Sequence, residues 1–113
     1  MIKEFLKSTT AIEHVANYKY QNKRDRIVCK DGFSMSVQAG SGLYCSPREC
    51  LEDGEYESVE IGFPSCEESL INTYAEDPSD YTDTVYGYVP VEIVDQVIIK
   101  HGGLLSLLKQ STA

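Results

Sequence analysis

Residues 33–39, FSMSVQA, decide the fold class of this chain. Apolar side chains occupy every second position, and a period of two is typical of a β-strand with one face in a core. The apolar set, expected in the core, is Phe33, Met35, Val37 and Ala39. The opposite face is small and polar, and we expect it to be exposed: Ser34, Ser36 and Gln38.

Turn residues precede this strand. Asp31-Gly32 has the composition of a tight hairpin turn, because glycine adopts positive φ without a Cβ clash. Residues 26–29 lie just before the turn and are suited to a short strand. The two segments therefore predict an antiparallel hairpin.

Two further strands are predicted downstream. Residues 58–63, SVEIGF, alternate in the same way, with an inward set made of Val59, Ile61 and Phe63. Residues 84–89, TVYGYV, predict the last strand. Alternation there places at least one of Tyr86 and Tyr88 in the core.

The N-terminal segment carries apolar residues at spacings that suit an amphipathic helix. Thr10 and Glu13 have the spacing of a capping box. A helix is therefore expected from about Thr10 to about Tyr20, with a short turn near residues 8–10.

Two more helices are predicted in the second half of the chain. Ser65 and Glu68 form another capping box, which opens a helix through Tyr74. Pro90 suits a helix start and Gly102 a helix end, so residues 91–101 predict the last helix.

These elements predict an α+β fold in a single domain, residues 1–113. Its sheet has three to four strands, mainly antiparallel, with two to three helices packed on one face. The expected parts are an N-terminal helical region (1–25), an α+β core (26–103) and a Leu-rich tail (104–113).

Overall charge excludes some partners. The chain has 113 residues and a formal net charge of −8, so its net field repels nucleic acid and anionic lipid. No apolar run approaches the roughly 20 residues of a membrane span, and MIKEFLKSTT lacks the apolar stretch of a signal peptide. We expect a cytoplasmic protein with no direct nucleic-acid or membrane contact.

Charge is distributed unevenly along the chain. Residues 1–48 carry a net +4, residues 49–95 carry fourteen acids and no Lys or Arg, and the remainder carries +2. An acidic surface of this kind serves solubility in most proteins. The exclusion of every Lys and Arg from 47 residues is more than solubility requires, so an acidic binding surface is the second interpretation.

Tyrosines accompany these acids, and Tyr offers large contact area at low entropic cost in interfaces. The sequence therefore predicts a surface that docks a basic protein. Its predicted members are Glu49, Glu52, Asp53, Glu55, Tyr56, Glu57, Glu76, Asp77, Asp80, Tyr81 and Asp83.

Catalytic and metal chemistry have weaker signals. Cys29, Cys45, Cys50 and Cys66 do not form two close pairs, so a metal site and a disulfide stay open beside free thiols, which a reducing cytoplasm favours. We expect no cofactor, metal or catalytic residue. One alternative is a small enzyme or ligand-binding protein that uses Cys45, Cys66 or His101 near the Gly40-Ser41-Gly42 turn. The other is a structural or homodimeric protein that uses its Leu-rich tail.

Several strings resemble those of small proteins encoded in bacteriophages and prophages. They are DGFSMSVQAG (31–40), YCSPR (44–48), VEIGFPS (59–65), YAEDPSDYTDTVYGYVPVEIV (74–94) and KHGG (100–103). The resemblance spans about residues 27–103 and transfers no residue roles. It implies a viral accessory protein in the cytoplasm of a bacterial host. Many such proteins, anti-CRISPR proteins among them, act by binding a host protein complex stoichiometrically. The resemblance therefore implies a non-enzymatic inhibitor or adaptor of a host nucleic-acid-handling protein, such as a CRISPR effector.

Overall fold

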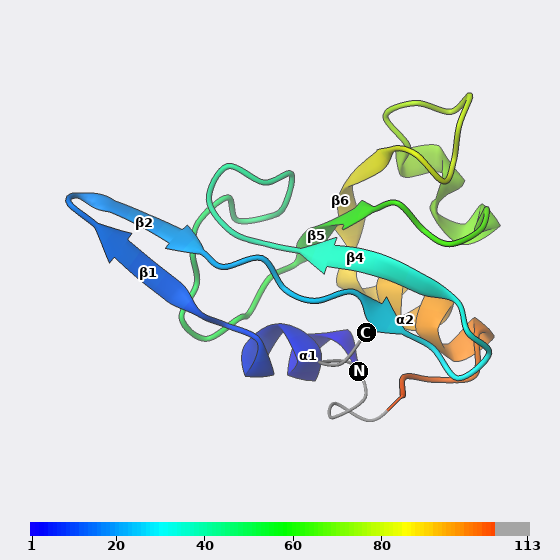
Figure 1. The fold of residues 1–113 in the computed structure, drawn as a ribbon, viewed down its shortest axis with the longest axis horizontal. Coiled ribbons are helices and arrows are strands. Elements are labelled where there is room, and N and C mark those ends of the chain that lie inside the picture. Colours follow the sequence, from blue (N-terminus) through cyan, green and yellow to red (C-terminus); the bar gives the residue numbers. More distant parts are fainter. Residues whose placement is uncertain (106–113) are drawn as a thin grey trace.

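A four-stranded antiparallel sheet in the order β3-β4-β5-β6 forms the centre of the computed structural model, which describes residues 1–105 (Figure 1). The elements are α1 (Ile2–Ser8), β1 (Ile12–Val15), β2 (Tyr18–Gln21), β3 (Ile27–Val28), β4 (Ser34–Gln38), β5 (Ser58–Gly62), the 3₁₀ helix η1 (Ser69–Tyr74), β6 (Val85–Pro90) and α2 (Val91–Lys100). The predicted α+β class is confirmed.

The hairpin around β4 forms as the alternation predicts. Cys29 N donates to Phe33 O at 2.7 Å, and Gly32 closes the turn with φ +96°. Val37 pairs with Ile61 of β5, which places both side chains on the helix-covered face. The whole predicted inward set of residues 33–39 is buried: Phe33, Met35, Val37 and Ala39.

Helices α1 and α2 cover one face of this sheet and contact each other (Figure 1). The α1 end is also held by a hydrogen bond from Ile2 N to Asp95 Oδ1 of α2 at 2.8 Å. Apolar side chains of both helices join the core: Ile2, Phe5, Leu6, Val91, Val94, Val97 and Ile98. No helix among residues 1–105 is long and apolar enough to cross a bilayer.

The predicted helix over residues 10–20 is wrong, because this segment is a β-hairpin. Strands β1 and β2 pair from Ile12↔Gln21 to Val15↔Tyr18, and Ala16 turns the chain at φ +54°. β-branched and aromatic residues make up half of each strand, and they favour extended backbone over helix. Only residues 2–8 of the predicted helical region form a helix, α1.

The open face of the sheet also differs from the prediction. Ser36 and Gln38 are buried, because the chain before β3 crosses this face. Arg24 N donates to Gln38 Oε1 at 2.9 Å, and Gln38 Nε2 donates to Arg24 O at 2.8 Å. Phe63, predicted inward, is instead 47% exposed at the end of β5.

The acidic half adds η1 and β6. Glu68, rather than Ser65, caps η1 by accepting from Leu70 N at 2.9 Å, and the helix is 3₁₀. Tyr86 is buried and Tyr88 is exposed, so the prediction of at least one core tyrosine is confirmed. At the other end Leu104 bridges to Cys29, whereas most of the predicted Leu-rich tail, residues 106–113, lies outside the described residues.

Candidate functional site

All nine acidic residues of the predicted docking surface are exposed. Tyr56 is not: it is 1% exposed, and its prediction as a contact residue is wrong. Its hydroxyl donates to Glu49 O at 2.7 Å and accepts from Leu51 N at 2.9 Å. Tyr56 therefore anchors the segment 49–57 to the core, because a buried phenol hydroxyl needs hydrogen-bond partners.

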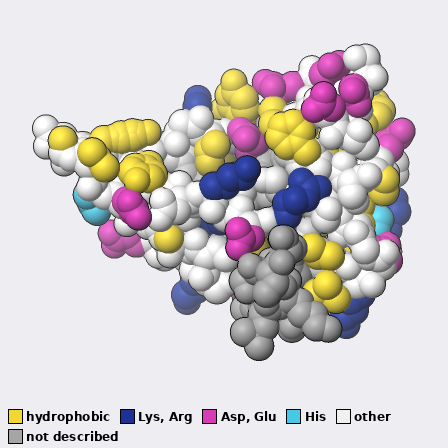
Figure 2. All heavy atoms as spheres, viewed as in Figure 1, with side chains coloured by type: hydrophobic (Ala, Val, Ile, Leu, Met, Phe, Trp, Pro, Cys, Tyr) yellow, Lys and Arg dark blue, Asp and Glu magenta, His cyan; other side chains and the backbone are white. Residues whose placement is uncertain are grey.

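The predicted residues lie in two separate loops. The segment 49–57 passes α1, where Gly54 packs against the Lys7 backbone. The loop 76–83 leads into β6. It begins beside that strand, where Glu76 N donates to Val85 O at 3.0 Å. Figure 1 places these loops on different sides of β5, and in Figure 2 Asp and Glu side chains gather at the upper right, where Figure 1 draws residues 76–83.

Local hydrogen bonds shape the 76–83 loop, which we call the acidic loop. Asp77 Oδ1 accepts from Ser79 N at 3.0 Å and from Ser79 Oγ at 2.5 Å. These bonds hold the pKa of Asp77 below its ordinary value, because they favour the ionised carboxylate. Among residues 1–105, no Lys, Arg or His forms an ion pair with this loop.

Exposed tyrosines border the acidic loop. A pocket of about 390 Å³ is lined by Tyr44, Tyr74, Ala75, Glu76, Gly87 and Tyr88. The rings of Tyr44 and Tyr88 lie 6.0 Å apart, and Tyr88 N donates to Tyr44 O at 3.0 Å. Tyr81, by contrast, is half-buried against the core, and its carbonyl accepts the Tyr86 hydroxyl.

A bulge turns Tyr88 outward. Val59 pairs with Val89 and Ile61 with Tyr86, so Glu60 alone faces two residues of β6. Tyr88 adopts φ +54°, which is strained for a bulky side chain. The sequence did not predict Tyr44 as a site residue, because Tyr44 precedes the acidic half of the chain. It did not predict Tyr88 either, because period-two alternation cannot reveal a bulge.

The contact between Arg48 and Tyr44 shows that the tyrosine pocket can bind a guanidinium group. The guanidinium carbon of Arg48 lies 5.4 Å from the centroid of the Tyr44 ring, within cation–π range. Arg48 Nε also donates to Leu43 O at 2.9 Å. The Tyr44 ring thus already contacts one arginine, and it lines the same pocket as the Glu76 carboxylate.

A second cluster surrounds His101 at the end of α2. Nδ1 of His101 lies 2.7 Å from Asp31 Oδ2, Nε2 lies 2.7 Å from Glu68 Oε1, and the ring stacks on Phe33 at 4.1 Å. Lys100 Nζ also reaches Glu68 Oε2 at 2.9 Å. The cluster joins the 31–32 turn, the η1 cap and α2.

Charges in this cluster stabilise one another. Burial disfavours a charged imidazole, but the hydrogen bonds to Glu68 and Asp31 raise the pKa of His101. Burial likewise opposes ionisation of Glu68, but the bonds from Leu70 N, Lys100 and His101 hold its pKa below the ordinary value. Because both ring nitrogens face carboxylates, His101 is not arranged as a base for a cysteine.

The cysteines are free thiols in different surroundings. Cys45 is buried, and its sulfur contacts Gly40 N at 3.4 Å and Gly40 O at 3.3 Å. Burial, with a smaller contribution from Asp31, raises the pKa of Cys29 to about 11. Residues 1–105 contain no group of three His, Cys, Asp or Glu residues placed to hold a metal ion.

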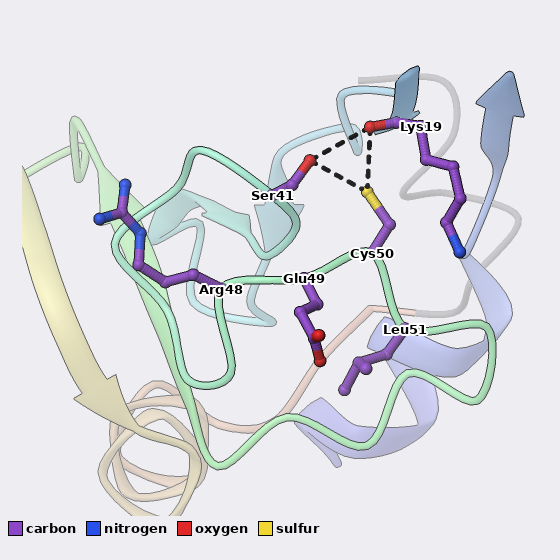
Figure 3. A pocket seen from close by; sticks show the side chains of 6 residues that line it. All are labelled: Lys19, Ser41, Arg48, Glu49, Cys50 and Leu51. Carbon is purple, nitrogen blue, oxygen red and sulfur yellow. Dashed lines mark hydrogen bonds between the residues drawn. The ribbon is translucent and has the colours of Figure 1, made fainter. Parts of the chain in front are cut away.

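Cys50 lies in a pocket of about 400 Å³ near the glycine turn (Figure 3). Its sulfur contacts Ser41 Oγ at 3.4 Å and Lys19 O at 3.8 Å, and Ser41 Oγ donates to Lys19 O at 3.2 Å. The charged ends of Arg48 and Glu49 point away from the sulfur in Figure 3. Within residues 1–105, the hydrogen-bond contacts of this thiol are thus a hydroxyl and a carbonyl, neither of which is a general base.

Exposure predicts which thiol reacts. Cys66 is the exposed cysteine, whereas Cys29, Cys45 and Cys50 are buried. With an aromatic disulfide reagent at pH 8, we expect one thiol per chain to react at least about tenfold faster than the others, which need local opening. The fast phase should disappear in Cys66→Ser and persist in the control Cys50→Ser. Two or more fast thiols in the folded protein would contradict this assignment.

The chain matches no protein-family model, no curated protein and no solved structure.

Proposed function

We propose that this chain is a non-enzymatic protein that binds a basic protein partner through the acidic loop and the adjoining tyrosine pocket. One observation carries the proposal: Glu76, which forms no ion pair within residues 1–105, lines the pocket formed with Tyr44, Tyr74 and Tyr88, so aromatic faces and a carboxylate meet at one place. A partner arginine entering there contacts a ring face and a carboxylate together, which are the two groups a guanidinium prefers.

The acidic loop sets the rate and salt dependence of this binding. Its carboxylates are exposed, so they attract a cationic partner over about a Debye length, roughly 8–10 Å at physiological salt. Such steering raises association rates and weakens as salt rises. The segment 49–57 is acidic too, but it has no exposed tyrosine within it, since Tyr56 is buried.

The sequence resemblance narrows the proposal. In its narrower form, the protein is a phage-encoded inhibitor or adaptor in the cytoplasm of a bacterial host, and its partner is a nucleic-acid-handling protein such as a CRISPR effector. The acidic loop then occupies a basic surface meant for a phosphate backbone. This form predicts competition: the purified chain should displace DNA from the effector, and binding elsewhere without displacement would contradict it.

Two charge-matched variants test the binding surface. Asp77→Lys/Asp80→Lys/Asp83→Lys reverses the acidic loop, and Glu49→Lys/Glu52→Lys/Asp53→Lys makes the same change in net charge at the other loop. With a fluorescein-labelled arginine-rich peptide as the probe, we expect the first variant to lose about tenfold or more in affinity at 50 mM salt. The second should lose about threefold or less.

Tyrosine substitutions separate specific from bulk attraction. Tyr44→Ala/Tyr88→Ala should weaken peptide binding about tenfold at both 50 and 300 mM salt, because the lost ring contacts are short-range. Equal losses in the two charge-reversal variants, or wild-type binding by the tyrosine variant, would show that net charge alone attracts the peptide and would overturn the proposed site.

A further inference from the structure

A groove on the open face of the sheet lies between the 22–26 crossing segment and β5. Its volume is about 430 Å³, within the range of small-molecule sites. Gly62 creates the hollow: it pairs with Ser36 on one side and Val85 on the other, and all three line the groove. A Cβ at position 62 would lie 3.6 Å from the Ser36 Cβ, in ordinary contact, so a side chain there would fill the floor without a backbone clash.

Two cations line this groove in a chain of net charge −8. Among residues 1–105, neither Lys23 nor Arg26 forms an ion pair with a carboxylate. Arg26 uses Nη2 on neutral acceptors, Ser34 O at 3.1 Å and Phe63 O at 2.6 Å. The positive charge of the groove is therefore available to an anion.

The groove also offers a polar floor. Ser36 is 8% exposed, and its hydroxyl oxygen accepts from Gln38 Nε2 at 3.0 Å. Ser36 lines the groove, and its hydroxyl can also donate a hydrogen bond to a ligand oxygen there. Glu60 also lines the groove, as the cross-strand partner of Gln38, and accepts from Tyr44 N at 3.1 Å.

Phe63 supplies an aromatic wall at a conformational cost. It has φ +50°, a left-handed value that a bulky residue rarely adopts. Phe63 N donates to Thr84 O at 3.0 Å, and Arg26 holds its carbonyl, so the surrounding chain imposes this geometry. The result is a half-exposed ring beside the two cations, where burial in the core was expected from alternation.

We propose that this groove binds a small aromatic anion, with the ring on Phe63 and a phosphate or carboxylate on Lys23 and Arg26. The ligand is small rather than a polymer, because Glu60 lies within the groove and the acidic surface of the chain repels an extended polyanion. This site is distinct from the acidic loop, and the proposal does not depend on the proposed function.

Titrations followed by amide NMR test the ligand class. Adenosine 5′-monophosphate and phenylpyruvate should each shift the amides of Ser36, Gly62 and Phe63, whereas adenosine and inorganic phosphate should bind at least about tenfold more weakly. Tighter binding of the monophosphate indicates a phosphate ligand, and tighter binding of phenylpyruvate a carboxylate. No binding of either anion at 10 mM, or tighter binding of a 12-nucleotide single strand, would overturn the proposal.

Variants tie the ligand to the groove. Gly62→Val should reduce affinity at least about tenfold by filling the floor, and Lys23→Glu should do so by reversing its charge. Lys3→Glu on α1 carries the same charge change and should bind as the wild type. Wild-type affinity in both groove variants would overturn the site, and Lys23→Glu alone decides if Gly62→Val does not fold.

Phe63→Asn gives an independent signature. Asn tolerates positive φ better than Phe, so this variant should melt at a higher temperature while binding at least about tenfold more weakly. Unchanged binding would contradict the role of the ring.

Discussion

Replacing His101 by alanine is expected to lower the free energy of unfolding by about 3 kcal/mol at pH 6. The change removes a charge-assisted hydrogen bond to Glu68, a carboxylate that is 1% exposed, and a ring stacked on Phe33. Among the described residues, Glu68 then keeps Lys100 and Leu70 N as its partners in a buried site. Loss of one partner of a buried charge is among the more destabilising single changes.

The same cluster makes stability depend on pH. The pKa of His101 is raised in the folded chain, so its contribution is fully present below the unfolded value of about 6.5 and is lost as pH rises through the folded pKa. The pKa values of Asp31 and Glu68 are lowered, so their contributions are present above about pH 4 and are lost as pH falls through the folded values. Stability from this cluster is therefore greatest between about pH 4.5 and 6.5.

Urea unfolding between pH 5 and 9 checks both expectations. The wild type should lose stability above about pH 6.5, and His101→Ala should lose that part of the slope. His14→Gln is the matched control, because His14 lies exposed on β1 and forms no ion pair with a carboxylate within residues 1–105. A slope that survives in His101→Ala, or that vanishes in His14→Gln, would assign the pH dependence to another group.

Replacing Gly54 by alanine is expected to cost about 2–5 kcal/mol of unfolding free energy. Gly54 has φ +68°, and a Cβ there would lie 2.9 Å from Lys7 Cα and 3.0 Å from Lys7 N. These atoms belong to the backbone of α1, so no rotamer change relieves the clash. Helix α1 must shift, which disturbs the packing of Phe5 and Leu6 in the core.

Gly42→Ala is the control for backbone strain alone. Gly42 has φ +82°, but a Cβ there meets nothing within 4 Å. Its substitution should cost only the conformational penalty of about 1–2 kcal/mol. Chemical denaturation of both variants measures the difference, and equal losses would show that the close approach of α1 to residue 54 contributes nothing.

Predictions from the sequence succeeded where local chemistry and tertiary contacts agree. The alternation of residues 33–39, the Asp31-Gly32 turn and the Pro90 to Gly102 helix all form as expected. The strand and the turn were predictable because each depends on a few neighbouring residues: the strand on period-two alternation, and the turn on the freedom of glycine to adopt positive φ. The prediction of a helix over residues 10–20 was wrong because it rested on apolar spacing alone. The β-branched and aromatic residues of this segment favour extended backbone, and the two strands pair as a hairpin.

Some features of the candidate site were also predictable from the sequence, and others were not. Exposure of the nine acids was predictable, since a carboxylate without a partner stays in water. The burial of Tyr56 was not, because it depends on the carbonyl of Glu49 and the amide of Leu51 as they meet in the folded loop. Tyr88 lies beside Tyr44 at a bulge in β6, which alternation along the sequence does not reveal.

By itself, the sequence determined the fold class, the central hairpin and the excess of acid over residues 49–95, because alternation, turn residues and charge are properties of neighbours along the chain. Only the tertiary contacts place the two acidic loops on different sides of β5, join His101 to Asp31 and Glu68, and set Phe63 at the border of a cationic groove. Each of these depends on contacts between residues far apart in the chain, and a one-residue bulge or a positive φ redirects such side chains without changing the local pattern.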